Sequence, residues 1–198
     1  GSMTCTSTAE ATARTPVAAT AAGQLFAPLA VGPITLANRI VLPAMVTRLS
    51  GEDGHVNAAI IDRYVRFAKG EPGLIVVEAM GISQAKSGPL LRIGEDAFLP
   101  GLKQLAARVH ATSATRVVPQ IIHFLKIARS GWRQTVADLS VAEIKDIIGQ
   151  FAAAAVRART AGFDGVELHM AHAYTLSSFL SRRNRRRDEY GGSLHNRL

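Results

Sequence analysis

Short apolar runs, which predict buried strands, alternate with amphipathic stretches, which predict helices, from about residue 40 onward. Strands are expected at 40–42, 73–78, 116–122 and 163–168. Helices are expected at about 61–69, 99–111 and 140–160. The run at 73–78 is almost continuously apolar, which is typical of a strand covered on both faces. The alternation therefore predicts a parallel sheet whose strands are joined by helical crossovers.

Individual residues mark the ends and the buried faces of these helices. Ser140, with Glu143 three residues later, forms a capping box that predicts the start of the third helix. Gly70 and Gly162 are expected to end the first and third helices. Pro119 predicts that its strand ends or takes a special position. The apolar faces expected to reach the core are 61, 64, 65 and 68, then 102, 105, 106 and 109, then 144, 147, 148, 151, 155 and 158.

Two architectures use repeated strand–helix units, namely an open doubly wound sheet and a closed barrel. The fingerprint G-x-G-x-x-G, which follows the first strand of many doubly wound sheets, is absent. The pattern alone leaves both folds open, so the choice depends on the residues that carry chemistry.

The composition indicates the cellular location and the kinds of partner to be expected. Residues 1–23 are interpreted as a tag scar, Gly-Ser-Met, and a flexible Ala/Thr-rich leader, with a transit peptide as the alternative and one domain at 24–198. The single cysteine, Cys5, excludes a disulfide framework within the chain and favours a reducing, cytoplasmic location. No apolar run approaches the roughly 20 residues that cross a bilayer, so no membrane association is expected.

The net charge of +8 raises the question of nucleic acid. Much of the excess lies in the arginine-rich stretch 182–187, which is interpreted as a solvated loop, with a phosphate or acidic-partner site as the alternative. A nucleic-acid binder would spread basic residues over a face and interleave aromatic ones. Nucleic acid is therefore not expected as a partner.

The densest chemistry follows the fourth expected strand, where His169, His172 and Tyr174 lie within six residues. In a barrel, the loops after the carboxyl ends of the strands form the catalytic face. Histidines three residues apart can face one side of a helical turn and aim two N–H donors at one oxygen. Tyr174 adds a weak acid with an ordinary pKa of about 10. The set suits a reaction that passes through an enolate-like anion.

Two other interpretations of the histidine pair stay open. A metal site would need a third ligand, and no H-E-x-x-H pattern is present, so no metal is expected. The histidines could also be structural residues in a crowded loop, which their spacing does not exclude.

The residues after the pair extend it into a longer pattern. F-L-S at 179–181, N-x-R at 184–186, D-x-Y-G-G-S at 188–193 and N-R at 196–197 follow the H-x-x-H-x-Y of 169–174. In this order they resemble the signature of the Old Yellow Enzyme family. L-F-A-P-L at 25–29 and N-R-I-V at 38–41 are similar to the family's opening, so the resemblance covers about residues 24–198.

The resemblance implies an α/β fold, a parallel (β/α)₈ barrel of TIM type, of which this chain holds the first half, about four βα units. It implies FMN as cofactor and NADH or NADPH as reductant. Contact with FMN would come from Pro43, Ala44, Met45, Val46, Ala79, Gln120 and His169. His169 and His172 would hold the carbonyl oxygen of an α,β-unsaturated substrate, an enone or enal. The flavin would pass hydride to the β-carbon, and Tyr174 would protonate the α-carbon.

Three positions depart from the family's pattern. Val46 stands where many relatives have Thr or Cys, so a hydrogen bond to the flavin is missing unless Thr47 supplies it. Met170 and Ala173 stand where the family usually has a small residue and glycine. Met170 would either narrow the pocket or pack against the barrel wall.

A barrel of this class needs about 250 residues, so the chain is expected to stop before the barrel closes. A second polypeptide that supplies the remaining strands is the favoured explanation, because two strand edges and an apolar face would otherwise be exposed. A self-completing homo-oligomer and an expression fragment are the alternatives. A non-catalytic subunit and a flavin-dependent isomerase or oxidase stay open as functions.

Overall fold

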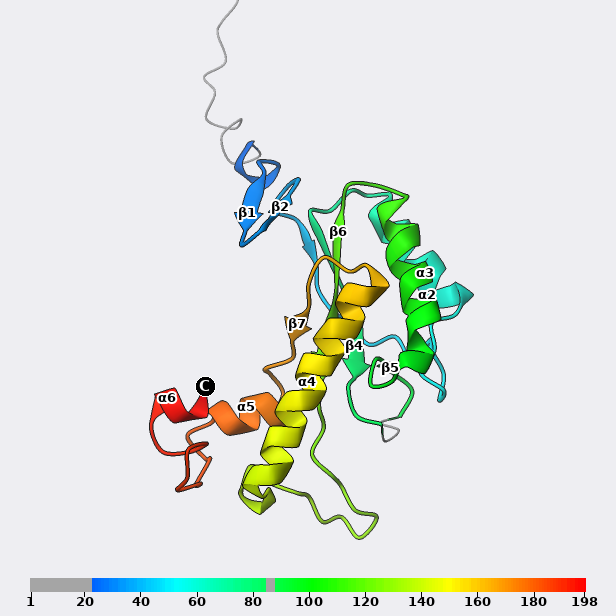
Figure 1. Ribbon diagram of the computed structural model, residues 1–198. Helices are drawn as coiled ribbons and strands as arrows, with labels where there is room; N and C mark the ends of the chain where they lie inside the picture. The colour runs from blue at the N-terminus through cyan, green and yellow to red at the C-terminus, as the bar shows by residue number, and fades with distance from the viewer. Residues whose placement is uncertain (1–22, 85–87) are drawn as a thin grey trace, which may run out of the picture.

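The computed structural model describes residues 23–84 and 88–198 (Figure 1). The expected tag scar and the leader, apart from Gly23, lie outside these described residues. The strands are β1 (Leu29–Val31), β2 (Ile34–Leu36), β3 (Val41–Leu42), β4 (Leu74–Gly81), β5 (Leu91–Arg92), β6 (Arg116–Ile122) and β7 (Glu167–Leu168). The helices are α2 (Ala58–Ala68), α3 (Leu99–His110), α4 (Val141–Ala161), α5 (Thr175–Leu180) and α6 (Leu194–Arg197), with short 3₁₀ helices η1 (Asp96–Phe98) and η2 (Val136–Asp138).

The main sheet is parallel, and its strands follow chain order, β3-β4-β6-β7, with the short β5 paired to the end of β4. A doubly wound sheet reverses its strand order at a switch point, and this sheet does not. Helices α2, α3 and α4 pack side by side in the same order and contact the sheet through β4 and β6. Figure 1 shows them on one side of it, with the β1–β2 hairpin at one end and α5 and α6 at the other. Consecutive βα units wound in one direction favour the barrel over the open sheet.

The core lies between the sheet and the three helices. Its fully buried side chains include Ile60 and Tyr64 of α2, Leu105 of α3, Ile75 of β4 and Ile121 of β6. The predicted inner face of α3, with residues 102, 105, 106 and 109, is buried as expected. No helix among the described residues has the length and apolar character that crossing a membrane requires.

Helix ends follow the sequence signals in all three cases, and the end before Gly70 differs only in which residue takes the left-handed conformation. The capping box of Ser140 with Glu143 begins α4, and Gly162 ends it with a left-handed φ of 92°. Helix α2 ends at Ala68, and the left-handed residue after it is Glu71 (φ 53°), not Gly70. The reason is tertiary, because the Asn38 side chain donates to the Glu71 carbonyl oxygen at 2.8 Å.

The buried stripe of α4 differs from the expected one at two positions. Ile148 is 54% exposed, and Ala154 is fully buried where Ala155 was expected. The buried residues 144, 147, 154, 158 and 161 are three, seven, four and three residues apart, and these spacings keep them on a single helix face. Ile148 and Ala155 each lie one residue off this stripe, about 100° around the helix.

One strand agrees with the sequence prediction, since β6 spans 116–122 and Pro119 takes a special position, and another strand, β7, differs from it. Strand β6 continues through Pro119, which faces a register shift in β4 between Val77 and Met80. Proline is tolerated there because the ladder is already interrupted. Strand β7 has two residues instead of the six expected. Before it, the Asp164 N–H donates to the Val117 carbonyl oxygen at 2.9 Å, but the Val117 N–H donates to the Asp164 carboxylate at 2.8 Å, so a side chain replaces one ladder bond.

Candidate active site

The predicted catalytic residues lie in the loop that connects β7 to α5, at the carboxyl end of the parallel sheet. His169 directly follows β7, and Tyr174 is the N-cap residue of α5. Between them His172 and Ala173 both adopt left-handed backbone conformations, with φ of 56° and 58°. The expected helical turn is therefore wrong, because two consecutive left-handed residues make a tight reversal instead.

That reversal brings the three side chains together. The ring centroids of His169 and His172 are 5.3 Å apart, and those of His169 and Tyr174 are 4.9 Å apart. The rings of His172 and Tyr174 are 6.3 Å apart, and all three pairs meet edge to face. The sequence prediction that these residues share one site agrees with this placement.

The hydrogen bonds of His169 define which ring nitrogen can donate. Its Nδ1 accepts the Ala171 N–H at 3.3 Å, so the proton of the neutral ring lies on Nε2. Burial and the neighbouring His172 lower the pKa of His169 below its ordinary value. The ring is therefore neutral near pH 7 and offers an Nε2–H donor. Within residues 23–84 and 88–198, no three metal-binding side chains of His, Cys, Asp or Glu gather.

Tyr174 stands on a small apolar cluster that also contains a predicted flavin contact. Its ring packs with Phe124, at a centroid distance of 5.0 Å, over Ala79, Leu90 and Ile122. Ala79 is only 3% exposed, so its side chain belongs to the floor beneath Tyr174. A small residue at the end of β4 therefore sets how deeply the tyrosine ring lies.

Gln120 lies on the strand next to the histidines and has a partner that sequence reasoning missed. In the sheet register Gln120 is opposite Glu167, and its Nε2 donates to the Glu167 carboxylate at 2.7 Å. One amide hydrogen and the amide oxygen of Gln120 remain for another ligand. The sequence did not reveal this pair, because the register that places Gln120 opposite Glu167 is set by the pairing of β6 with β7.

The loop with the other predicted flavin contacts follows β3. Met45 and Val46 are 52% and 50% exposed, Pro43 is exposed and Ala44 is half-buried. The Thr47 hydroxyl, expected to compensate for Val46, donates instead to the Glu78 carboxylate, with O–O distances of 2.9 and 3.0 Å.

Glu78 is fully buried and anchors this loop to the sheet. It accepts hydrogen bonds from the Thr47 N–H at 3.1 Å and from the Tyr64 hydroxyl at 3.1 Å. The Glu78 N–H donates in turn to the Tyr64 oxygen at 2.8 Å. Burial, and then the charge of Glu78, raises the pKa of Tyr64 well above its ordinary value. The sequence predicted that Tyr64 faces the core, but it did not predict the bond to Glu78, because a single glutamate in an apolar run has no local signature.

His123, which directly follows β6 and lies three residues after Gln120, ties β6 to α5. The Thr175 hydroxyl donates to the His123 carbonyl oxygen at 2.9 Å, and His123 Nδ1 lies 2.8 Å from the same hydroxyl. Since the hydroxyl proton is already used, Nδ1 is the donor in that contact. Burial lowers the pKa of His123, which keeps the ring neutral near pH 7.

Two hollows flank α5, and their lining residues show which of the two Met170 faces. One, of about 870 Å³, is lined by His172 and Tyr174. The other, of about 460 Å³, is lined by Met170 and by residues of α4 such as Ile147 and Phe151. Met170 thus faces α4 and does not narrow the cavity beside His172.

Much of the signature after α5 holds a loop together. The buried Asn184 side chain donates to the carbonyl oxygens of Phe179 and Tyr190 at 3.0 and 2.7 Å. The Arg186 side chain pairs with Asp188 through two hydrogen bonds and also donates to two carbonyl oxygens of the η2 segment. Arg186 therefore departs from the expected solvated loop, whereas the other arginines of 182–187 are exposed.

Comparison with known proteins shows to which sequences this chain is similar. Residues 24–198 match the sequence model described as the NADH:flavin oxidoreductase / NADH oxidase family. The chain is 38% identical over 195 residues to an NADH oxidase of Thermoanaerobacter brockii, covering 88% of this chain and 30% of that protein. It is 36% identical over 193 residues to an NADPH dehydrogenase of Bacillus velezensis, covering 89% of this chain and 57% of that protein.

Solved structures agree with the fold. Morphinone reductase in complex with tetrahydroNAD superimposes with a TM-score of 0.75 at 28% identity, over 87% of this chain and 56% of that one. An old yellow enzyme homologue from Zymomonas mobilis gives 0.76 at 26% identity, over 88% and 56%. The predicted fold, the first half of a (β/α)₈ barrel, is confirmed, and the chain spans about half the length of these proteins.

Proposed function

The chain belongs to the NADH:flavin oxidoreductase / NADH oxidase family, and from this premise we propose that it acts in an FMN-dependent reductase of the ene-reductase type. The family uses FMN with NAD(P)H as reductant. The proposed reaction moves hydride from NAD(P)H to the activated C=C bond of an α,β-unsaturated carbonyl compound. The observation that supports it is the convergence of His169, His172 and Tyr174 at the carboxyl end of the sheet.

The residues present fit a flavin. An isoalloxazine ring is flat and apolar, with polar edges, and it needs a few hydrogen-bond donors beside an apolar surface. The exposed side chains of Met45 and Val46 supply such a surface. The Gln120 amide and the His169 Nε2–H are donors at the ends of neighbouring strands. When bound there, FMN would supply the hydride chemistry.

The chain's own residues then supply orientation, charge stabilisation and a proton. His169 is neutral and donates from Nε2, and His172 beside it adds a second imidazole. Two donors aimed at a carbonyl oxygen stabilise the negative charge that develops on it in the transition state. Tyr174 holds its phenol proton beside both rings, which suits protonation of the α-carbon.

A visible absorption spectrum and steady-state kinetics test this function. We expect a yellow protein that reduces 2-cyclohexenone with NADPH, and an about 100-fold lower rate in His172→Ala, the usual effect of removing one such donor. His195→Ala, at an exposed histidine outside the site, is the matched control and should leave the rate unchanged. A protein that binds no flavin in any assembly would refute the proposal and favour a non-catalytic subunit. Flavin binding without enone reduction would favour an isomerase or oxidase.

We further propose that a complementary half-barrel chain completes the barrel. In the described part of the sheet, β3 and β7 are the edges of the main strand order. Val41 of β3 and Leu168 of β7 are 46% and 47% exposed, which leaves apolar side chains at both edges. Unpaired edges with apolar side chains favour addition of further strands.

Native mass of the purified protein, alone and after co-expression with neighbouring genes, tests the partner. A yellow species whose mass includes a second, different chain supports the heteromer. A yellow homodimer would replace it with a self-completing pair, and a stable yellow monomer would refute both.

A further inference from the structure

The cavity of about 870 Å³ beside His172 and Tyr174 carries an unbalanced positive charge. Lys126, Arg133 and Arg183 all line it, and no Asp or Glu is among its lining residues. Apolar side chains, hydroxyl groups, the amides of Gln134 and Asn184 and the His172 imidazole supply the rest of the wall. A cavity with three cationic side chains and no anionic one attracts negatively charged ligands.

The imbalance is already present in the two chain segments that line most of the cavity. Residues 97–137 contain six Lys or Arg and no Asp or Glu, and residues 168–187 contain five Arg and no Asp or Glu. The two acids that follow the first segment most closely are each used at a helix start. Asp138 and Glu143 accept the backbone and hydroxyl hydrogens of Thr135 and Ser140 in two capping boxes.

The three cationic side chains have no ion-pair partner among the described residues. Arg157 pairs with Asp96 and Arg186 with Asp188, but no carboxylate lies within 4.0 Å of the charged atoms of Lys126, Arg133 or Arg183. All three residues are exposed, so their charged groups are accessible to an oxyanion that enters the cavity, and arginine and lysine form strong charge-assisted hydrogen bonds with such a group.

We propose that this cavity binds an oxyanion group carried by a ligand whose other end reaches His172 and Tyr174. The inference rests on the proposed function and names the chemistry of its ligand. The oxyanion is either the pyrophosphate of the nicotinamide reductant or the carboxylate of an unsaturated acid substrate. Both present oxygens that arginine and lysine bind, and both carry an uncharged reacting end.

Trp132 provides a fluorescent probe beside the site, between the lining residues Ile127 and Arg133. It is the only tryptophan of the chain and lies in the small loop closed by the Ile127–Arg133 bridge, where it is 52% exposed. Its fluorescence can be followed while inorganic pyrophosphate, NADP⁺ or cinnamate is added to the purified protein. We expect saturable binding that weakens as the salt concentration rises, because screening reduces the attraction.

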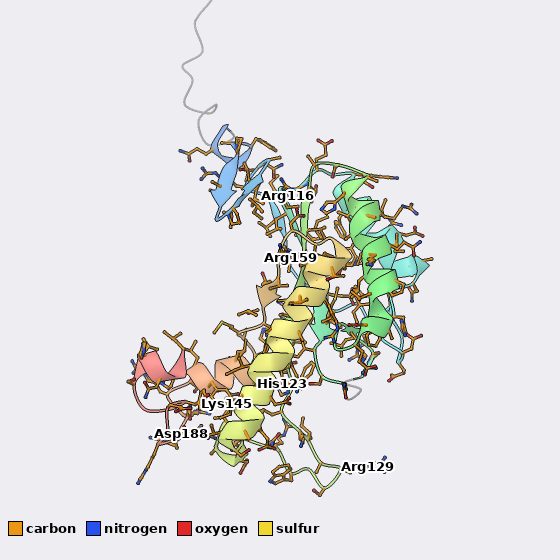
Figure 2. The ribbon with its side chains drawn as sticks, in the orientation of Figure 1. Arg116, His123, Arg129, Lys145, Arg159 and Asp188 are labelled. Carbon is orange, nitrogen blue, oxygen red and sulfur yellow. The ribbon has the colours of Figure 1, made fainter. Side chains whose placement is uncertain are left out.

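Charge-neutral variants locate the site. Lys126→Gln, Arg133→Gln and Arg183→Gln should each weaken pyrophosphate binding about 10-fold, the usual order for one lost charge-assisted contact. Arg129→Gln is the matched control, since Arg129 lies at the tip of the same loop (Figure 2) and does not line the cavity. It should change the dissociation constant less than twofold.

Competition distinguishes the two ligand sources. If NADP⁺ displaces pyrophosphate and cinnamate does not, the site serves the reductant; displacement by cinnamate assigns it to the substrate. No saturable binding, or equal weakening by Arg129→Gln, would overturn the inference. Pyrophosphate binding needs no flavin, so a colourless protein that binds pyrophosphate would refute the proposed function alone. A yellow, active protein without anion binding would refute the cavity alone.

Discussion

The Tyr64 hydroxyl makes hydrogen bonds to Glu78 where the ladder of β4 is interrupted. Because Glu78 also holds Thr47, removal of this hydroxyl tests how the loop after β3 is anchored. The register shift between Val77 and Met80 interrupts the ladder of β4, and the Glu78 N–H donates to the Tyr64 oxygen at 2.8 Å. The same hydroxyl donates to the Glu78 carboxylate at 3.1 Å. Tyr64→Phe removes both contacts and keeps the ring, so no cavity term enters.

The expected loss follows from the groups left behind. A buried N–H without an acceptor costs about 1–3 kcal/mol, and a carboxylate that loses a donor costs about the same or more. Because Thr47 still donates to Glu78 through its N–H and hydroxyl, the carboxylate stays partly satisfied. We therefore expect Tyr64→Phe to lower the free energy of unfolding by about 3 kcal/mol.

Urea denaturation of the assembled protein measures this loss, and Tyr190→Phe is the control. Tyr190 is half-buried, and its hydroxyl makes no hydrogen bond within the described residues, so its variant should cost less than about 0.5 kcal/mol. A loss below about 1 kcal/mol for Tyr64→Phe would show that the bulge N–H finds another partner and would refute the reasoning. A second readout is the visible spectrum of bound flavin, which should shift if the loop of Met45 and Val46 moves.

Three further changes test other parts of the fold by denaturation. Ala173→Gly should raise the free energy of unfolding by about 1 kcal/mol, because alanine at a φ of 58° is strained and glycine is not; a loss would contradict the left-handed turn. Gly191→Ala should cost about 2 kcal/mol or more, since its Cβ would lie 2.3 Å from the Arg186 carbonyl oxygen; a neutral effect at this position would refute the close approach. Burial raises the pKa of Asp164, but hydrogen bonds from Val117, His110 and Arg116 outweigh it and lower the pKa overall. Its stabilisation is therefore present above the ordinary pKa of about 4 and is lost as pH falls through the lowered value. Asp164→Asn should reduce the difference in unfolding free energy between pH 7 and pH 3, and an unchanged difference would refute this assignment.

The sequence predicted the elements of the fold wherever local signals agreed with the tertiary structure. The capping box at Ser140 and the left-handed Gly162 were predicted because both act within one turn of α4. Glu71 and Ala154 were missed because Asn38 and the sheet, both distant in sequence, decide their conformation and burial. The two-residue β7 was missed because a side chain, Asp164, replaces a ladder bond, which no periodicity reports.

The residues of the candidate site also fall into two groups, those that the sequence identified and those that it missed. His169, His172 and Tyr174 were identifiable because they lie close together in the sequence and are chemically distinctive. Glu78 and Glu167 were missed because each acts on a partner more than 10 residues away, on another strand or helix. A carboxylate in a strand has the same sequence appearance whether it faces solvent or a buried hydroxyl.

Most residues of the family signature after α5 stabilise the conformation of the loop at 181–193, and this loop affects the position of Tyr174. Asn184 donates to a carbonyl oxygen of the loop, and Arg186 donates to a carbonyl oxygen near η2 and pairs with Asp188. Gly191, which has no side chain, lets the backbone at Arg186 approach closely. The loop they fix lies against α5, whose first turn follows Tyr174. A rigid loop restricts the motion of a ring that has to lie within about 5 Å of His169. Residues that hold the loop would thus help to set the distance on which the proposed proton donor, Tyr174, depends.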